Sequence, residues 1–348
     1  MKEPGILVTG GAGYIGSHVL LRLRERPCRA VVLDDLSTGR EDAVLHGRLI
    51  HGDVGDMGLV RQLIHEHRIA LVMHFAAKTV VPESVEDPLR YYESNTSKTR
   101  NLIQCCADSG VRHFVFSSTA AVYGVPPGGV ASETTPLQPI NPYGSSKLMS
   151  ERMLDDVAAV SPLRHVTLRY FNVAGADPQG RIGQSKQGCT LLTKVACEAA
   201  LGRRPHVSIY GTDYDTPDGT GIRDYIHVDD IARAHVAAVD YLFDGGASVT
   251  LNCGYGHGYS VREVMNAMER VHGGSIEVRT ERRRPGDPPV LIADATRIRD
   301  VLHWQPAHDD LEEILRSALD WEHELLRREH QAGFRLPGAR PAAGLAAK

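Results

Sequence analysis

The chain has 348 residues, with 39 basic and 43 acidic side chains and a formal net charge of -4. This balance gives no indication of a nucleic-acid partner, and no apolar stretch approaches the length of a transmembrane helix. The N-terminal Met-Lys-Glu-Pro leads directly into a strand, so we expect no signal peptide. The six cysteines form no C-x-x-C pair, and the seventeen histidines show no metal-ligand spacing. We therefore expect a cytoplasmic protein without a metal, with one large domain or two closely associated ones.

The first informative segment joins a short apolar strand, Ile6–Val8, to a glycine-rich turn and the start of a helix. Glycines at 10, 13 and 16 let the backbone turn tightly and approach a pyrophosphate, which then lies on amide groups at a helix N-terminus. The spacing is G-x-x-G-x-x-G, for which a plain turn is the alternative interpretation. The strand before the turn and the helix after it favour a dinucleotide site.

A second buried strand over residues 30–35 ends in Asp34 and Asp35, about 20 residues after the glycines, where a ribose-binding carboxylate is expected. Such a carboxylate accepts hydrogen bonds from ribose hydroxyls and repels a 2′-phosphate, which favours NAD over NADP. The alternative is that both aspartates only begin the turn over residues 36–39. Arg40 is close enough in sequence to offset part of the repulsion.

Strands and helices continue to alternate through the first half of the chain. Strands are expected over residues 48–52, 70–75, 112–117 and 165–171, and helices over residues 57–68, 93–109 and 146–159. This alternation predicts an α/β fold with a Rossmann-type, doubly wound parallel sheet covered on both faces. Loops rich in glycine and proline follow residue 172. We expect an NAD-binding domain over 1–172, on which some later segments pack back, a smaller α/β substrate domain over 173–335, and a flexible tail over 336–348.

The segment Asn141–Lys147 carries a candidate catalytic pair, Tyr143 and Lys147, four residues apart. At the start of a helix both side chains lie on one face, and the lysine ammonium favours the phenolate form of the tyrosine. Upstream, Ser117, Ser118 and Thr119 end a predicted strand at the carboxyl edge of the sheet, where ligands bind in doubly wound folds. Thr119 can share a hydrogen bond with a substrate hydroxyl and pass its proton to Tyr143. A surface Tyr–Lys helix pair is the alternative.

Seven segments carry a resemblance to a known family: Thr9–Gly16, His74–Ala77, Ser117–Gly124, Tyr143–Lys147, Arg169–Gly175, Gly219–Val228 and Arg284–Asp287. Together they resemble the extended short-chain dehydrogenase/reductase family, and within it the UDP-glucose 4-epimerases, over nearly the whole chain. The resemblance implies tightly held NAD, a UDP-sugar substrate and a homodimer. It also implies reversible epimerisation at C4 through a 4-keto sugar, in which hydride leaves C4 for NAD and returns to the other face.

The resemblance further implies which residues contact each ligand. The catalytic set is Thr119, Tyr143 and Lys147. For NAD, the implied contacts are Gly10, Gly13, Tyr14, Ile15 and Gly16 at the pyrophosphate, Asp34 at the adenosine ribose, Asp53 and Val54 at the adenine, Phe75, Ala76, Ala77 and Asn95 along the cofactor, and Ser117, Tyr143, Lys147 and Tyr170 towards the nicotinamide. For the substrate, they are Thr119, Asn172, Thr190, Arg223, Arg284, Asp287 and Leu291. Arginine suits phosphate oxygens, and a carboxylate suits a ribose diol.

Three positions bear on how closely the chain follows the family. Lys98 stands where the family usually has glycine, which is expected to alter packing near the cofactor. Thr190 lies in a segment, Gly188–Thr193, that departs from the usual pattern at the diphosphate. Leu291 aligns with the residue beside the sugar 2-position, and its bulk favours a hexose over an N-acetylhexosamine.

Three alternative functions remain open at this point. The first is 4-epimerisation of another UDP-sugar, such as the glucuronate, a pentose or an N-acetylhexosamine. The second, a 4,6-dehydratase, needs an acid and a base after the catalytic threonine, where this chain has Ala120 and Ala121. The third, a non-enzymatic NAD(H) sensor, has no need of Thr119, Tyr143 and Lys147.

Overall fold

A seven-stranded parallel sheet is the largest element of the computed structural model, which describes residues 3–284 and 286–331. The strand order is β12-β7-β5-β4-β1-β2-β3, and every neighbouring pair is parallel. The chain moves outward from β1 in both directions, so the predicted doubly wound α/β fold is confirmed. The strands are β1 (Gly5–Thr9), β2 (Arg29–Asp34), β3 (Arg48–His51), β4 (Ile69–His74), β5 (His113–Thr119), β7 (Arg164–Tyr170) and β12 (Val249–Cys253).

Helices cover both faces of this sheet, and each face packs in its own apolar cluster. Successive side chains of β1 point to opposite faces and so belong to different clusters. Leu7 packs in one apolar cluster with Val60 and Leu102, which lie on α2 (Met57–His67) and α5 (Lys98–Asp108). Ile6 packs in the other with Leu20, together with residues of α1 (Tyr14–Leu23) and α8 (Val228–Phe243). Because both faces are covered, central strands such as β1 and β2 are buried at consecutive residues rather than at alternate ones.

Two helices near the carboxyl edge of the sheet differ from the predicted bounds. The helix expected over 146–159 is α6 (Pro142–Val160), which starts four residues earlier because Asn141 caps it and proline occupies its first position. The helix expected over 93–109 begins as a π-helical turn, Tyr92–Ser97, preceded by the short helices α3 (Val81–Glu86) and α4 (Pro88–Tyr91). Among the described residues, no helix has the length and apolar character needed to cross a membrane.

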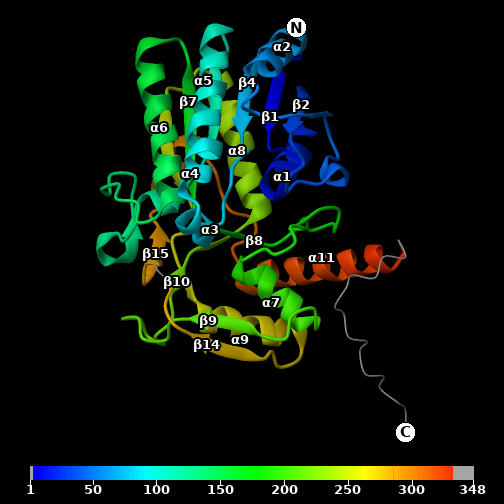
Figure 1. Ribbon diagram of the computed structural model, residues 1–348, viewed down its shortest axis with the longest axis vertical. Coiled ribbons are helices and arrows are strands. Elements are labelled where there is room, and N and C mark those ends of the chain that lie inside the picture. Colours follow the sequence, from blue (N-terminus) through cyan, green and yellow to red (C-terminus); the bar gives the residue numbers. More distant parts are fainter. Residues whose placement is uncertain (1–2, 285, 332–348) are drawn as a thin grey trace.

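The later part of the chain builds smaller sheets below the large one (Figure 1). Strand β12 is the exception, because it returns to pair with β7 and extends the large sheet. The boundary at residue 172 stays a prediction, and the tail over 336–348 lies outside the described residues. The remaining strands are β6 (Val130–Ala131), β8 (Asn172–Ala174), β9 (Val207–Tyr210), β10 (Ile222–Arg223), β11 (Tyr225–His227), β13 (Tyr259–Ser260), β14 (Val278–Glu281) and β15 (Val290–Ala293), and the remaining helices are α7 (Leu192–Ala200), α9 (Val261–His272), α10 (Thr296–Leu302) and α11 (Leu311–Gln331).

Candidate active site

The glycine-rich turn between β1 and α1 lies against the segment that follows β4. Gly10 has φ of 72°, and a Cβ there would lie 2.5 Å from the backbone nitrogen of Ala76. A Cβ on Gly16 would collide with the carbonyl oxygen of Gly10. Gly13 is the N-cap of α1 and contributes no side chain to it. Only glycine therefore permits this turn, and it leaves the backbone at the N-terminus of α1 open to a close ligand.

Asp34 lies at the end of β2 and joins the glycine turn to the turn that follows it. Its carboxylate accepts hydrogen bonds from the backbone amides of Ala12 and Leu36, each at 2.9 Å. Burial raises the pKa of this carboxyl, while the two amides lower it. The carboxylate thus shapes the following turn and also faces the glycine turn. Arg40 forms an ion pair with Asp42 at 2.6 Å, so its charge is balanced locally.

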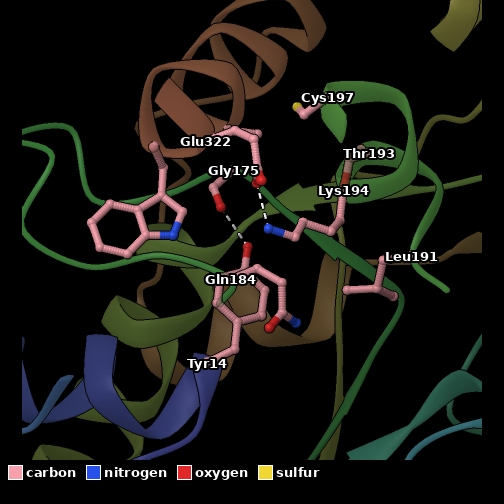
Figure 2. Close-up of a pocket in the computed structure, with 10 residues that line it drawn as sticks. Tyr14, Gly175, Gln184, Leu191, Thr193, Lys194, Cys197 and Glu322 are labelled. Carbon is pink, nitrogen blue, oxygen red and sulfur yellow. Dashed lines mark hydrogen bonds and ion pairs between the residues drawn. The ribbon is translucent and has the colours of Figure 1, made fainter. Parts of the chain in front are cut away.

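The side chain of Tyr14 points towards Gly175, as Figure 2 shows. Its hydroxyl donates a 2.6 Å hydrogen bond to the carbonyl of Gly175, and the ring lines a pocket beside the ion pair of Lys194 with Glu322. Any contact of Tyr14 with a pyrophosphate must therefore come from its backbone. The neighbouring Ile15 is partly buried against the main apolar core.

Two residues predicted to lie along the cofactor are held by specific partners. Asn95 is buried in the π-helical turn, where its amide exchanges hydrogen bonds with the backbone of Lys78 and donates to Ser146 on α6. Asp53 forms an ion pair with Lys98 at 2.5 Å. Against the effect of burial, Lys98 and a backbone amide lower the pKa of Asp53. The unusual lysine therefore contacts the carboxylate that was expected beside the adenine, and Val54 next to it is buried.

The residues expected beside the nicotinamide meet at the carboxyl ends of β4, β5 and β7. Ser117 and Tyr170 share a hydrogen bond between their hydroxyl groups. The ring of His235, on α8, lies 4.8 Å from the ring of Phe75 and 5.8 Å from that of Tyr170. Burial lowers the pKa of His235 to about 4, so it is a neutral packing partner. Ala77 follows Phe75 at the same edge of the sheet. His235 was not predicted, because it is 160 residues away from Phe75 in the chain.

Thr119, Tyr143 and Lys147 come together between the end of β5 and the first turns of α6. The Lys147 side chain is buried, and its Nζ lies 4.4 Å above the centre of the Phe116 ring. Burial lowers the pKa of Lys147 to about 7, although the Glu151 carboxylate raises it. Burial also raises the pKa of Tyr143, while its hydrogen bond with Thr119 lowers it. The lower phenol pKa expected from Lys147 is therefore not found, because burial raises the pKa of Tyr143 more than the Thr119 hydrogen bond lowers it.

Contacts in the structure connect four of the predicted substrate residues. Arg223 on β10 is the register partner of Leu291 on β15, and its guanidinium lies 3.7 Å from the carboxylate of Asp287. Asn172, on β8, hydrogen-bonds through its backbone amide to the carbonyl of Asp224. For the remaining two, Arg284 stacks on the ring of Tyr210 with its guanidinium carbon 3.6 Å from the ring centre, and Thr190 is exposed in the loop before α7.

The buried carboxylate of Asp224 holds the substrate side together and was not predicted. It accepts hydrogen bonds from the backbone amides of Tyr255, Gly256 and Ala293 at 2.9 to 3.3 Å. These contacts tie the segment that carries Arg223 to β15 and to the turn after β12. The only sequence signal was its place in the segment Gly219–Val228, since its partners are more than 30 residues away.

A family model, described as the NAD dependent epimerase/dehydratase family, matches residues 6–254. The chain belongs to this family. A UDP-glucose 4-epimerase from Azospirillum brasilense is 55% identical over 332 residues, which are 95% of each chain. The crystal structure of UDP-glucose 4-epimerase from Brucella ovis in complex with NAD is 43% identical, with a TM-score of 0.88 over 91% of this chain and 97% of that one. The UDP-Glc/GlcNAc 4-epimerase from Campylobacter jejuni is 49% identical, with a TM-score of 0.81 over 92% and 99%.

These similarities confirm the resemblance to extended short-chain dehydrogenase/reductase epimerases. They also confirm NAD as the cofactor, which the sequence predicted from Asp34 and the glycines. The ligand contacts assigned to individual residues stay predictions, and they enter the proposal below.

Proposed function

We propose that this protein interconverts UDP-glucose and UDP-galactose by NAD-dependent epimerisation at C4, through a 4-keto sugar. The observation that carries the proposal is the meeting of Thr119, Tyr143 and Lys147 at the carboxyl edge of the parallel sheet of an NAD-dependent epimerase family. The 55% identity to the Azospirillum enzyme, over 95% of both chains, supports the same substrate pair.

The residues around the glycine turn fit NAD. Gly10 and Gly16 pack against backbone atoms that a Cβ would collide with, and the backbone there lies at the N-terminus of α1, which suits a pyrophosphate. Asp34 suits a ribose diol and disfavours a 2′-phosphate, and Arg40 does not offset this because Asp42 pairs with it. Bound NAD supplies the hydride acceptor and donor for C4 of the sugar.

The proton transfers fall to Tyr143 and Thr119. Tyr143 removes the proton of the sugar 4-hydroxyl when that carbon is oxidised and returns it when the carbon is reduced again. Thr119 hydrogen-bonds the same hydroxyl and aligns it with the phenol oxygen. Because burial raises the pKa of Tyr143, its phenolate form needs a nearby positive charge, which the Lys147 ammonium provides on the next turn of α6.

The nucleotide part of the substrate is assigned to the smaller sheets. Arg223 and Arg284 are assigned to the diphosphate together with Asn172 and Thr190, and Asp287 is assigned to accept hydrogen bonds from the uridine ribose. The Arg223–Asp287 separation of 3.7 Å brings both charges to one place, which supports a shared ligand. Leu291 closes the space beside the sugar 2-position, which favours a hexose.

The second candidate substrate is a UDP-N-acetylhexosamine, because the Campylobacter relative, 49% identical, is named a UDP-Glc/GlcNAc 4-epimerase. The two candidates are separated by assaying UDP-glucose, UDP-N-acetylglucosamine, UDP-glucuronate and UDP-xylose for their 4-epimers with no added NAD. We expect UDP-glucose to turn over most efficiently. Equal efficiency with UDP-N-acetylglucosamine contradicts the assignment of Leu291, and no epimer from any of the four overturns the proposed function.

A second copy of this chain is the proposed partner, and the cytoplasm is the proposed location. Val85, Leu89 and Met149 are exposed apolar side chains on α3, α4 and α6, which contact one another, and Leu89 is 77% exposed. Exposed apolar surface of this kind suits an interface. The six cysteines are free, as in a reducing compartment. Light scattering of the purified protein tests the dimer, and a monomer mass at assay concentration excludes it.

A further inference from the structure

Glu151 on α6 is a buried carboxylate with an unusual set of partners. Its side chain lies one helical turn beyond Lys147, and the residue is 3% exposed. The hydroxyl of Ser118 donates a hydrogen bond to Oε1, and the guanidinium of Arg169 donates from Nε to both oxygens at 3.1 Å and from Nη2 to Oε2 at 2.6 Å. All three side chains are buried, and they form what we name the Glu151 cluster.

The Glu151 cluster connects three elements that carry proposed catalytic or nicotinamide-side groups, which are β5, β7 and α6. Ser118 lies between Ser117 and Thr119 on β5, and it is the register partner of Arg169, which immediately precedes Tyr170 on β7. Paired residues of a parallel sheet point to the same face, so Ser118 and Arg169 both face α6. A single carboxylate thus links β5 and β7 to the helix that carries Tyr143 and Lys147.

The surroundings of Lys147 explain why this carboxylate matters chemically. From β5 the ammonium faces the apolar ring of Phe116. From β4 it faces His74, which is neutral because burial lowers its pKa to about 3, and which hydrogen-bonds Thr9 and Thr99. On α6 itself it has Tyr143 on one side and Glu151 on the other, and Glu151 is the group that raises the pKa of Lys147.

Two further tyrosines lie close to the neighbours of Lys147 on α6, one beside Tyr143 and one beside the Arg169 partner of Glu151. Tyr91 on α4 faces Tyr143 edge to face, with ring centres 6.4 Å apart. Tyr123, in the turn after β5, accepts a hydrogen bond from Arg169 at 3.0 Å on the side away from Glu151. The carboxylate of Glu151 forms an ion pair with Arg169 and lies one helical turn from Lys147.

We propose that Glu151 is a positioning residue that keeps Lys147 protonated beside Tyr143, while Ser118 and Arg169 hold the carboxylate in place. The inference rests on the proposed function, since it gives Lys147 its role. Without the carboxylate, Lys147 loses its proton at lower pH and the phenolate of Tyr143 loses its stabilising charge. The active range of pH then narrows.

The test is the pH dependence of single-turnover reduction of enzyme-bound cofactor by UDP-glucose, followed by the absorbance of reduced nicotinamide. The wild type, Glu151→Gln and Glu133→Gln are compared. Glu133 is a matched control, because its carboxylate accepts a hydrogen bond from the backbone of Asn252, at the far end of this polar region. We expect the alkaline limb to move to lower pH by about one unit in Glu151→Gln, and to stay in place in Glu133→Gln.

The outcomes separate the two proposals. A wild type that reduces no cofactor with any UDP-sugar overturns the proposed function itself. The inference is overturned if the wild type is active and Glu151→Gln is slower at every pH while both limbs of its pH profile stay where they are in the wild type. Glu151 then has a structural role only. Arg169 becomes an unpaired buried charge in Glu151→Gln, so a variant that fails to fold is replaced by Glu151→Gln/Arg169→Met, for which a smaller shift in the same direction is expected, because the loss of the Arg169 charge offsets part of the effect.

Discussion

The carboxylate of Asp34 accepts a hydrogen bond from the backbone amide of Ala12 at 2.9 Å, which joins the end of β2 to the glycine turn. This contact places the carboxylate beside the segment that is proposed to hold the pyrophosphate. It also means that a change at Asp34 acts on two features at once, the ribose contact and the shape of the turn.

Asp34→Asn is expected to weaken NAD binding by about tenfold or more, because hydrogen bonds to a charged group contribute roughly 1.5–3 kcal/mol. The same change removes the repulsion of a 2′-phosphate, so the preference for NAD over NADP should fall. Titration of the cofactor-free protein with each dinucleotide measures both. Asp35→Asn is the control, since Asp35 is exposed and only shapes its own turn. An unchanged ratio of the two affinities in Asp34→Asn contradicts the assignment.

Gly16→Ala is expected to reduce the cofactor that stays with the protein through purification. The added Cβ collides with the Gly10 carbonyl, a backbone atom that moves only if the whole turn moves. The dissociation constant of NAD should rise by about tenfold or more, in line with the roughly 1–3 kcal/mol stored in a strained backbone. Gly58→Ala on α2 is the control, because its Cβ meets only a carboxylate oxygen at 3.3 Å. Equal cofactor content in both variants argues against the turn as the pyrophosphate site.

Tyr143→Phe is expected to lower kcat by about 10²–10⁴-fold, which is the usual loss when a general base is removed. NAD should remain bound, because the phenyl ring still fills the same space. Epimer formation from UDP-glucose and the cofactor content of the variant are the two measurements. Tyr241→Phe on α8 removes a hydroxyl far from the sheet edge and should keep full activity. Full activity in Tyr143→Phe would exclude this residue as the base.

Arg223→Met is expected to raise KM for UDP-glucose by about ten- to a hundredfold while changing kcat much less, since charge-assisted hydrogen bonds to phosphate contribute roughly 1.5–3 kcal/mol. The methionine keeps most of the length of the buried stem, so β10 should retain its register with β15. Arg282→Met, at an exposed arginine of the same part of the chain, is the control. A loss in kcat alone would place Arg223 in the chemistry rather than in nucleotide binding.

His308 is expected to stabilise the fold in a pH-dependent way. Asp229, at 3.4 Å, and Glu313, at 2.6 Å, raise the pKa of His308 from 6.5 to about 9. The folded state therefore holds this proton more tightly than the unfolded chain does. The resulting stabilisation, about 1–2 kcal/mol for a partly screened cluster, is complete below pH 6.5 and is lost as the pH rises through 9.

Urea unfolding of the wild type and of His308→Gln at pH 6 and pH 10 measures this contribution. The two proteins should differ in their free energy of unfolding at the lower pH and agree at the higher one. His323→Gln, at an exposed histidine of α11, should match the wild type at both. A difference between wild type and His308→Gln that is the same at both values of pH would show packing rather than charge.

The sequence predicted the parts of this site that depend on neighbours along the chain. The glycine turn, Asp34 and the Tyr143–Lys147 spacing each lie within one strand–turn–helix unit, so local pattern was enough. Strand β12 was not predicted to join the large sheet, because its partner strand β7 lies more than 80 residues earlier and the pattern of its own five residues does not specify that pairing. The pKa of Tyr143 was expected to fall and instead rises, because the extent of its burial depends on elements packed around α6.

The sequence alone determined the doubly wound fold, the family and the cofactor. The reason is that the glycine turn, the apolar strands and the carboxylate at the end of the second strand are each set by residues close together in the chain. Only the tertiary structure decided that Glu151 meets Ser118 and Arg169, that Asp224 ties the Arg223 segment to β15, and that Tyr14 turns towards Gly175. The physical reason is that a buried charge is stable only with partners, and the fold chooses those partners from positions far apart in the chain.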